Sequence, residues 1–161
     1  MAGVTRNEIR RRLTAFAKEW QHASREQADA KLFWARFYEC FGIRPESATI
    51  YEKAVAKLGG GRGFIDSFIP GKLIVEHKSK GKDLAGAFAQ ASEYFMALPE
   101  AERPRYIITS DFARFRLTDL RTGKEHECTL KDLPKRAGWF AFLVDDAEEI
   151  TEESKVDRKA A

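Results

Sequence analysis

The sequence predicts an α/β protein in which a small mixed β-sheet is flanked by helices. Apolar residues recur at helical spacing up to about residue 58, and short β-rich runs separated by turn signals follow from residue 64. With 161 residues, 43% of them hydrophobic and 33% charged, the chain can bury a real core. We therefore expect one domain over residues 1–150, helical over 1–58, and a charged tail or truncated linker at 151–161.

Three helices are expected in the first part. Residues 5–8 have the form of a capping box, and apolar residues then follow at helical spacing as far as Trp20. A second helix runs from about residue 24 to a stop at Gly42, and its aromatic residues suit a packed core better than base stacking because of their helical spacing. A third helix is expected from Pro45 to about Leu58.

The period of the sequence changes after the glycine-rich turn at residues 59–63. Two β-rich runs, Phe64–Ile69 and Leu73–Lys78, flank the turn dipeptide Pro70-Gly71 and read as a β-hairpin. An Ala-rich helix over 84–98 follows, and hairpin and helix together make a unit at 61–98 that carries the site. The remaining expected elements are strands at 106–109, 112–120 and 124–130 and a last helix at 131–143.

The hairpin carries charged residues where an apolar strand would otherwise continue. Glu76 and Lys78 are two apart on one strand and share a face, and Asp66 on the neighbouring strand can lie within a few ångströms of Glu76. Carboxylates in such a pair are suited to Mg²⁺, which neutralises phosphoryl oxygens and activates water. We expect Asp66, Glu76 and the backbone carbonyl of His77 to bind the metal, with Lys78 orienting the attacking water or stabilising developing charge. The alternative is a salt bridge of Lys78 on a solvated strand face.

The helix after the hairpin extends the site. Gln90 and Tyr94 are four residues apart and share a helix face that can point back at the hairpin. Gln90 can then hydrogen-bond a water or a phosphate, and Tyr94 can support the lysine; alternatively they are a surface glutamine and a core tyrosine. Lys80 and Lys82 can contact DNA phosphates, although such charges are also common surface decoration.

These motifs resemble those of the PD-(D/E)XK nuclease superfamily, in particular the N-terminal cleavage domain of single-chain type IIG and IIL restriction–modification enzymes. Asp-x(9)-Glu-x-Lys combined with Gln-x3-Tyr is fairly specific, and the resemblance extends over about residues 28–120. The sequence departs at Ile65, where the superfamily name has proline. The matching stretches are Gly63–Asp66, Val75–Ser79, Lys82–Leu84, Gln90–Tyr94 and Tyr106–Phe115.

The resemblance implies a restriction-endonuclease-like core and a Mg²⁺-dependent DNA endonuclease, with Mn²⁺ expected to substitute. It also implies that Glu52, on the preceding helix, reaches a metal or its water. Such enzymes act on double-stranded DNA and continue into methyltransferase and target-recognition domains, neither of which is recognisable in these residues. We expect those domains in a full-length protein or a partner chain, and a transient dimer for double-strand cutting. The alternatives are a non-catalytic DNA-binding module of the same fold and a structure-selective repair or junction nuclease.

Composition indicates which partners and which cellular compartment to expect for the protein. The net charge of +3 and the isoelectric point near 8.9 fit a nucleic-acid partner without requiring one. The two cysteines lack zinc-ligand spacing, and no apolar run approaches the roughly 18 residues of a membrane span. We therefore expect a cytoplasmic protein without a membrane partner.

Overall fold

The computed structural model describes residues 4–23, 26–44, 50–56, 62–79 and 81–144. Within these residues, six strands form one mixed sheet in which the spatial order is the chain order, β1-β2-β3-β4-β5-β6. Neighbouring strands are antiparallel except β3 and β4, which are parallel and are connected through a helix. The strands are β1 (Ile50–Ala56), β2 (Arg62–Ile69), β3 (Leu73–His77), β4 (Tyr106–Ser110), β5 (Arg114–Asp119) and β6 (Glu125–Thr129).

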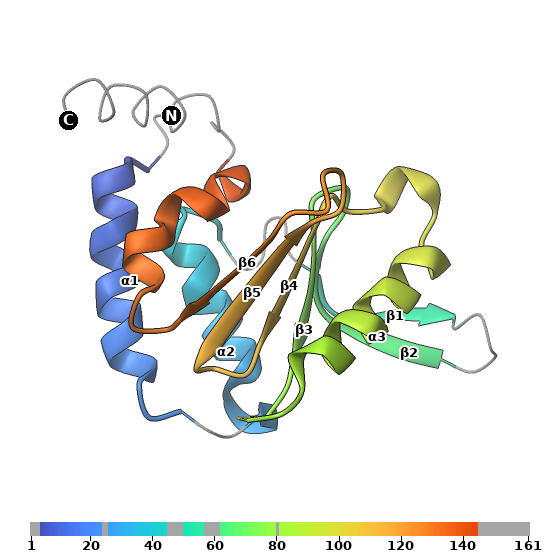
Figure 1. The fold of residues 1–161 in the computed structure, drawn as a ribbon, viewed down its shortest axis with the longest axis horizontal. Helices are drawn as coiled ribbons and strands as arrows, with labels where there is room; N and C mark the ends of the chain where they lie inside the picture. The colour runs from blue at the N-terminus through green and yellow to red at the C-terminus, as the bar shows by residue number, and fades with distance from the viewer. Residues whose placement is uncertain (1–3, 24–25, 45–49, 57–61, 80, 145–161) are drawn as a thin grey trace.

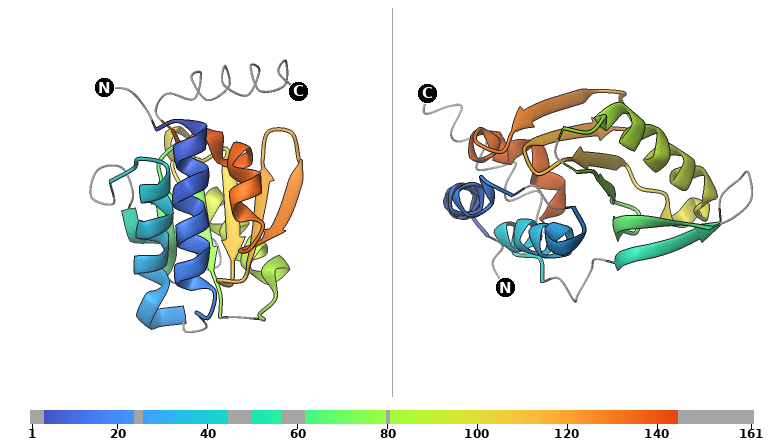
Figure 2. Two further views of the ribbon diagram at one scale, coloured as in Figure 1. Left: turned by 90° about the vertical axis from the view of Figure 1, so that its left-hand side faces the viewer. Right: turned by 90° about the horizontal axis from the view of Figure 1, so that it is seen from below.

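Helices cover both faces of the sheet, which confirms the predicted fold class (Figure 1). One face packs against a layer of three helical segments, which stand side by side in the left view of Figure 2. The other face packs against a single helix that connects β3 to β4. The first layer holds α1 (Arg6–Trp20), α2 (Glu26–Cys40) and the 3-10 segment η2 (Leu133–Leu143); α3 (Leu84–Ala97) lies opposite, and the short η1 (Glu100–Glu102) follows it.

The start of α1 follows the predicted capping signal. Thr5 is the N-cap, and its hydroxyl accepts a hydrogen bond from the Glu8 N–H at 3.2 Å. The Glu8 carboxylate pairs with Arg11 and Arg12 on the next turn. The residues at the predicted apolar positions are buried, which fixes how α1 faces the rest of the helical layer.

The larger core lies between the helical layer and the sheet, and aromatic rings fill much of it. Phe33 and Phe37 of α2 each stack on Phe115 of β5 with ring centroids 5.8 Å apart. All three rings are at most 1% exposed. The prediction that the aromatic residues of α2 pack in the core is therefore confirmed.

The predicted third helix is wrong where the structure describes it. Residues 50–56 form strand β1, paired antiparallel with β2, so the part at 1–58 is not helical throughout. Tyr51, Ala54 and Val55 do recur at helical spacing, but Tyr51 and Val55 also fit an alternating strand, and backbone pairing with β2 decides between the two. Residues 45–49 and 57–58 lie outside the described residues.

The last predicted helix is also only partly right. Its residues form a 3-10 segment with non-helical backbone angles at Arg136 and Phe140. Pro134 lies at its start and Gly138 in its middle, and both residues disfavour a continuous α-helix. The predicted hairpin, the helix after it and the later strands are confirmed within a few residues at each end. The expected tail at 151–161 lies outside the described residues.

Among the described residues, none of the helices combines the length and the apolar character needed to cross a membrane.

Candidate active site

The hairpin places Asp66 beside Glu76. The paired register of β2 and β3 ends at Ser67 and Val75, and Asp66 and Glu76 are the next residues on the two strands. Beyond this point the Asp66 carboxylate accepts a hydrogen bond from the His77 N–H at 2.8 Å. A side-chain oxygen thus takes over as acceptor just past the end of the ladder, and this bond holds the carboxylate against β3.

Glu76 is a carboxyl group in an unfavourable environment. It is 2% exposed, and burial raises its pKa to about 9, with the nearby charge of Asp66 adding to the effect and that of Lys78 opposing it. Its Oε1 atom has no hydrogen-bond partner among the described residues. A buried carboxyl beside a second carboxylate is a costly arrangement that a bound cation would relieve.

Lys78, Gln90 and Tyr94 form a hydrogen-bonded chain from β3 to α3. The Lys78 ammonium donates to Gln90 Oε1 at 2.7 Å, and Gln90 Nε2 donates to the Tyr94 hydroxyl, also at 2.7 Å. Tyr94 is 2% exposed and packs in the core under α3, so the chain ends on a fixed group. The structure therefore brings together Asp66 and the four other residues that the sequence placed at the centre of the site.

Glu52 belongs to a different element than predicted. It lies in strand β1, not on a helix, and its side chain is outside what the structure describes. The antiparallel register of β1 and β2 pairs Tyr51 with Ser67 and Lys53 with Ile65, so position 52 lies opposite Asp66. Residues 52, 66 and 76 thus occupy one level on three consecutive strands.

The two predicted phosphate-binding lysines fall between β3 and α3 in the sequence. Lys80 is outside the described residues. Lys82 is exposed, and its backbone carbonyl accepts a hydrogen bond from Arg114 at 2.9 Å. The loop ends at Asp83, whose side chain accepts from the Ala85 N–H and caps α3.

A buried aspartate holds this loop, and sequence reasoning missed it. Asp111, 1% exposed in the turn between β4 and β5, accepts from the Gly81 N–H at 3.0 Å and from the Arg114 guanidinium at 3.0 Å. Burial acts to raise the pKa of Asp111, but these hydrogen bonds outweigh it and leave the pKa below its usual value. An aspartate directly after a β-strand is a common turn signal, so nothing local marked its reach to Gly81.

Helix α2 ties the two site strands together from the opposite face of the sheet. Trp34 Nε1 donates to His77 Nδ1 at 3.0 Å, and the hydroxyls of Tyr38 and Ser67 lie 2.6 Å apart in a hydrogen bond. Burial lowers the pKa of His77 to about 4, so its ring is neutral. The aromatic pattern of α2 had predicted packing but not these two polar contacts.

Comparison with known proteins places this fold in a family. A family model described as the MmeI N-terminal domain matches residues 11–161. The chain belongs to this family. Among solved structures, the cryo-EM structure of a DrdV–DNA complex is similar, with a TM-score of 0.56 and 16% sequence identity over 83% of this chain. The likeness is one of fold, and the chain spans 14% of the DrdV chain. No curated protein matched in the sequence comparison.

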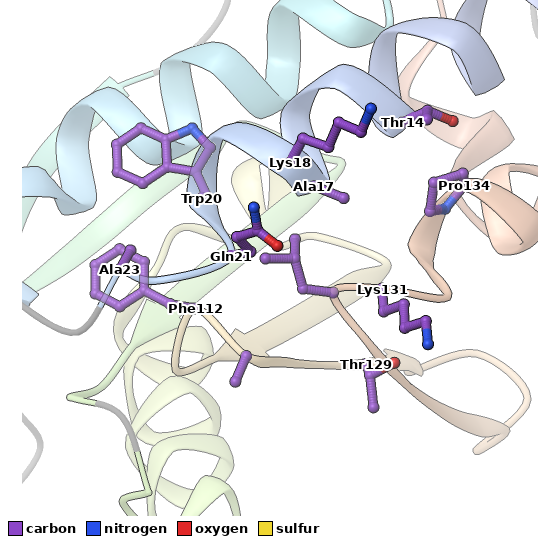
Figure 3. A pocket seen from close by; sticks show the side chains of 12 residues that line it. Thr14, Ala17, Lys18, Trp20, Gln21, Ala23, Phe112, Thr129, Lys131 and Pro134 are labelled. Atoms are coloured by element: carbon purple, nitrogen blue, oxygen red, sulfur yellow. The ribbon is translucent and has the colours of Figure 1, made fainter.

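The domain also has a cavity of about 620 Å³ on the helical-layer side of the sheet (Figure 3). The cavity lies between α1 and the end of β6, and none of its lining residues carries a carboxylate. Phe112, which lines it, is the one described non-glycine residue with positive φ, at 72°, and its ring lies 4.2 Å from that of His77. Neither Asp66 nor Glu76 lines this cavity, so it is separate from the candidate active site.

Proposed function

We propose that this domain hydrolyses phosphodiester bonds of double-stranded DNA with the help of a divalent cation, as the PD-(D/E)XK-type cleavage domain of a restriction–modification enzyme. The observation that carries the proposal is that Asp66 and the buried Glu76 lie side by side on two adjacent strands, with Lys78 directly after β3 and close enough for its charge to act on Glu76. Membership of the MmeI N-terminal domain family supports it, as does the similar fold found in a DrdV–DNA complex.

The residues fit a hydrated Mg²⁺ ion, with Mn²⁺ as a substitute. Magnesium is usually held by one or two carboxylates and keeps several waters, which matches the pair Asp66 and Glu76. Among the described residues, no group of three His, Cys, Asp or Glu side chains gathers as a metal site. The further ligands in this proposal are the backbone carbonyl of His77 and Glu52, whose side chain lies outside what the structure describes. When bound, the cation neutralises charge on the phosphate and makes water more acidic.

Lys78 is the residue that would act on the reacting phosphate itself. Its ammonium is directed by Gln90, and Gln90 is in turn anchored by the hydroxyl of the buried Tyr94. Because these hydrogen bonds hold the Lys78 ammonium in one place, it can stabilise negative charge that develops on the phosphate, or orient the attacking water, without first having to move. Gln90 supports this role through its hydrogen bond with Lys78, and Tyr94 supports it indirectly, through its hydrogen bond with Gln90.

DNA would approach over the loop between β3 and α3. Lys82 lies in this loop, and Lys80 is two residues before it in the sequence; both would contact phosphates without reading the base sequence. The net charge of +3 is in keeping with such a partner. Base recognition and methylation would belong to other domains of a longer protein or of a partner chain, and a transient dimer would allow both strands to be cut.

A plasmid-nicking assay tests the proposal. Purified protein with Mg²⁺ or Mn²⁺ should nick or linearise plasmid DNA, EDTA should stop it, and Lys78→Ala should slow it by about 100-fold or more. Lys124→Ala is the matched control, because Lys124 is exposed in the turn between β5 and β6, away from the site.

Three results would count against this function. Equal cleavage by wild type and Lys78→Ala would place the activity elsewhere. DNA binding without any cleavage would favour a non-catalytic binding module. Cleavage of branched but not linear DNA would favour a structure-selective nuclease.

A further inference from the structure

Thr109 on β4 is the direct neighbour of Glu76. The parallel register pairs Glu76 with Thr109, and paired residues on adjacent strands direct their side chains to the same face of a sheet. The alternation along β4 agrees: Ile107 belongs to the core under α3, whereas Ile108 belongs to the core under the helical layer. Thr109 therefore lies on the α3 side, with Glu76.

Thr109 and Glu76 each have a buried side-chain oxygen that forms no hydrogen bond with any described residue. Thr109 is 1% exposed and its Oγ1 has no hydrogen-bond partner among the described residues, as is also true of Glu76 Oε1. No direct hydrogen bond joins the two atoms. Buried polar atoms in native proteins are nearly always paired, and two unpaired ones on adjacent strands indicate a shared small polar partner.

A purely structural threonine explains the position poorly. A β-branched side chain does suit a strand, but valine would fill the same volume without burying an unpaired hydroxyl. Thr118 shows the contrast: it is buried on the same face of β5, where it pairs in register with Ile107, and its side-chain oxygen is not among the unsatisfied buried atoms of the described residues.

We propose that Thr109 is a positioning residue of the carboxylate site, whose hydroxyl holds a water of the divalent cation's hydration shell against Glu76. The inference rests on the proposed function, since it requires a cation at Asp66 and Glu76. Mg²⁺ keeps several of its waters in such sites, and a water between two polar groups can satisfy both. Groups that hydrogen-bond to the metal's ligands, without contacting the metal themselves, orient those ligands and affect metal affinity.

Metal titration of variants tests this inference independently of cleavage. Thr109→Val should bind Mg²⁺ and Mn²⁺ about 10-fold more weakly by calorimetry, while Thr109→Ser should bind as the wild type does. In EDTA the Thr109→Val protein should unfold at the wild-type temperature or above it, because an unpaired buried hydroxyl has been removed. Thr118→Val is the matched control and should leave metal affinity unchanged.

The possible failures separate cleanly. If Thr109→Val binds metal as tightly as wild type, Thr109 is not a positioning residue and the proposed function is untouched. If Thr109→Val loses affinity only in step with a lower unfolding temperature in EDTA, its role is structural and the inference is wrong. If wild-type protein binds neither cation, the proposed function fails, and this inference fails with it.

Discussion

At the scale of single residues, Glu76 lies where burial and the charge of Asp66 outweigh the stabilisation that Lys78 gives to its ionised form. The carboxyl group is buried under α3, has Asp66 as a neighbour, and leaves Oε1 without a described partner. Removing one such group from water without full compensation lowers the stability of the folded state. We interpret this loss of stability as a consequence of the proposed role of Glu76 in binding a divalent cation.

Replacing Glu76 with its uncharged isostere should therefore stabilise the metal-free protein. The pKa of Glu76 rises from its ordinary 4.5 to about 9, so the cost is absent below pH 4.5 and grows as the pH rises towards 9. In EDTA at pH 9 we expect Glu76→Gln to gain about 1 kcal/mol or more, which raises the melting temperature by about 2–4 °C per kcal/mol.

Thermal unfolding of both proteins at pH 4 and pH 9 checks this prediction. The difference should vanish at pH 4, and added Mg²⁺ should raise the melting temperature of wild type but not of the variant. A variant that is less stable at both pH values would show that Glu76 stabilises the fold.

How much of the site the sequence can predict depends on the range of its contacts. Alternation on a strand and the four-residue spacing of a helix are local rules, so Glu76, Lys78 and the pair Gln90 and Tyr94 could be found from them. Thr109 could not, because its position beside Glu76 depends on a parallel pairing across 33 residues, 109 − 76. No local pattern sets the register of such a pair.

At the scale of elements, the loop between β3 and α3 is held by another loop. Asp111, in the turn between β4 and β5, accepts a hydrogen bond from the Gly81 N–H, and Arg114, the first residue of β5, donates one to the Lys82 carbonyl. The Lys78 N–H also donates to the Ser110 carbonyl at 2.8 Å. The residues after the Glu-x-Lys motif are therefore positioned by the neighbouring turn as well as by their own sequence.

Asp111→Asn should loosen this loop and remove part of the acid sensitivity of the protein. Because the folded pKa of Asp111 lies below its ordinary 3.8, its contribution to stability is present above pH 3.8 and is lost as the pH falls through the folded value. We expect a loss of about 2 kcal/mol at pH 7 that shrinks below pH 3.8.

Urea unfolding over pH 3–7 measures this difference, and Asp132→Asn, in a part-exposed position before η2, is the control. A loss that stays constant with pH would show that the Asp111 charge is not what holds the loop. DNA binding gives a second measurement. If Lys82 is displaced and loses its phosphate contact, the slope of log affinity against log salt concentration should become shallower by about 1.

Strand β1 shows where element prediction reaches its limit. Residues 50–56 contain Ala, Glu and Lys, which favour helices, and their apolar spacing suits either structure. The strand forms because its backbone pairs with β2 over the whole length of β1, an interaction that lies outside any local window. The hairpin of β2 and β3 was easier to predict, since its turn dipeptide lies between its strands.

At the scale of the whole molecule, the helical layer and the site form one structure. Trp34 and Tyr38 of α2 reach through the core to His77 on β3 and Ser67 on β2. Both contacts are fully buried, so they fix the two strands that carry Asp66 and the Glu-x-Lys motif. Disturbing α2 should therefore affect the site from the far face of the sheet.

Trp34→Phe tests this coupling. The variant keeps an aromatic ring but leaves His77 Nδ1 buried without its donor, which should cost about 1–3 kcal/mol in urea unfolding. It should also weaken Mg²⁺ binding in calorimetry. Trp139→Phe is the control, because Trp139 is only half-buried and stacks on His126. Equal losses from the two substitutions would show that the hydrogen bond to His77 contributes nothing specific.

The bond between Trp34 and His77 also gives the domain an intrinsic optical signal. Indole fluorescence responds to the hydrogen bonding and polarity around the ring, and this indole touches the residue that separates Glu76 from Lys78. The chain has three tryptophans, so a variant in which Phe replaces Trp20 and Trp139 would have Trp34 as its sole tryptophan emitter. Events at the carboxylates could then be followed in real time without attaching a dye.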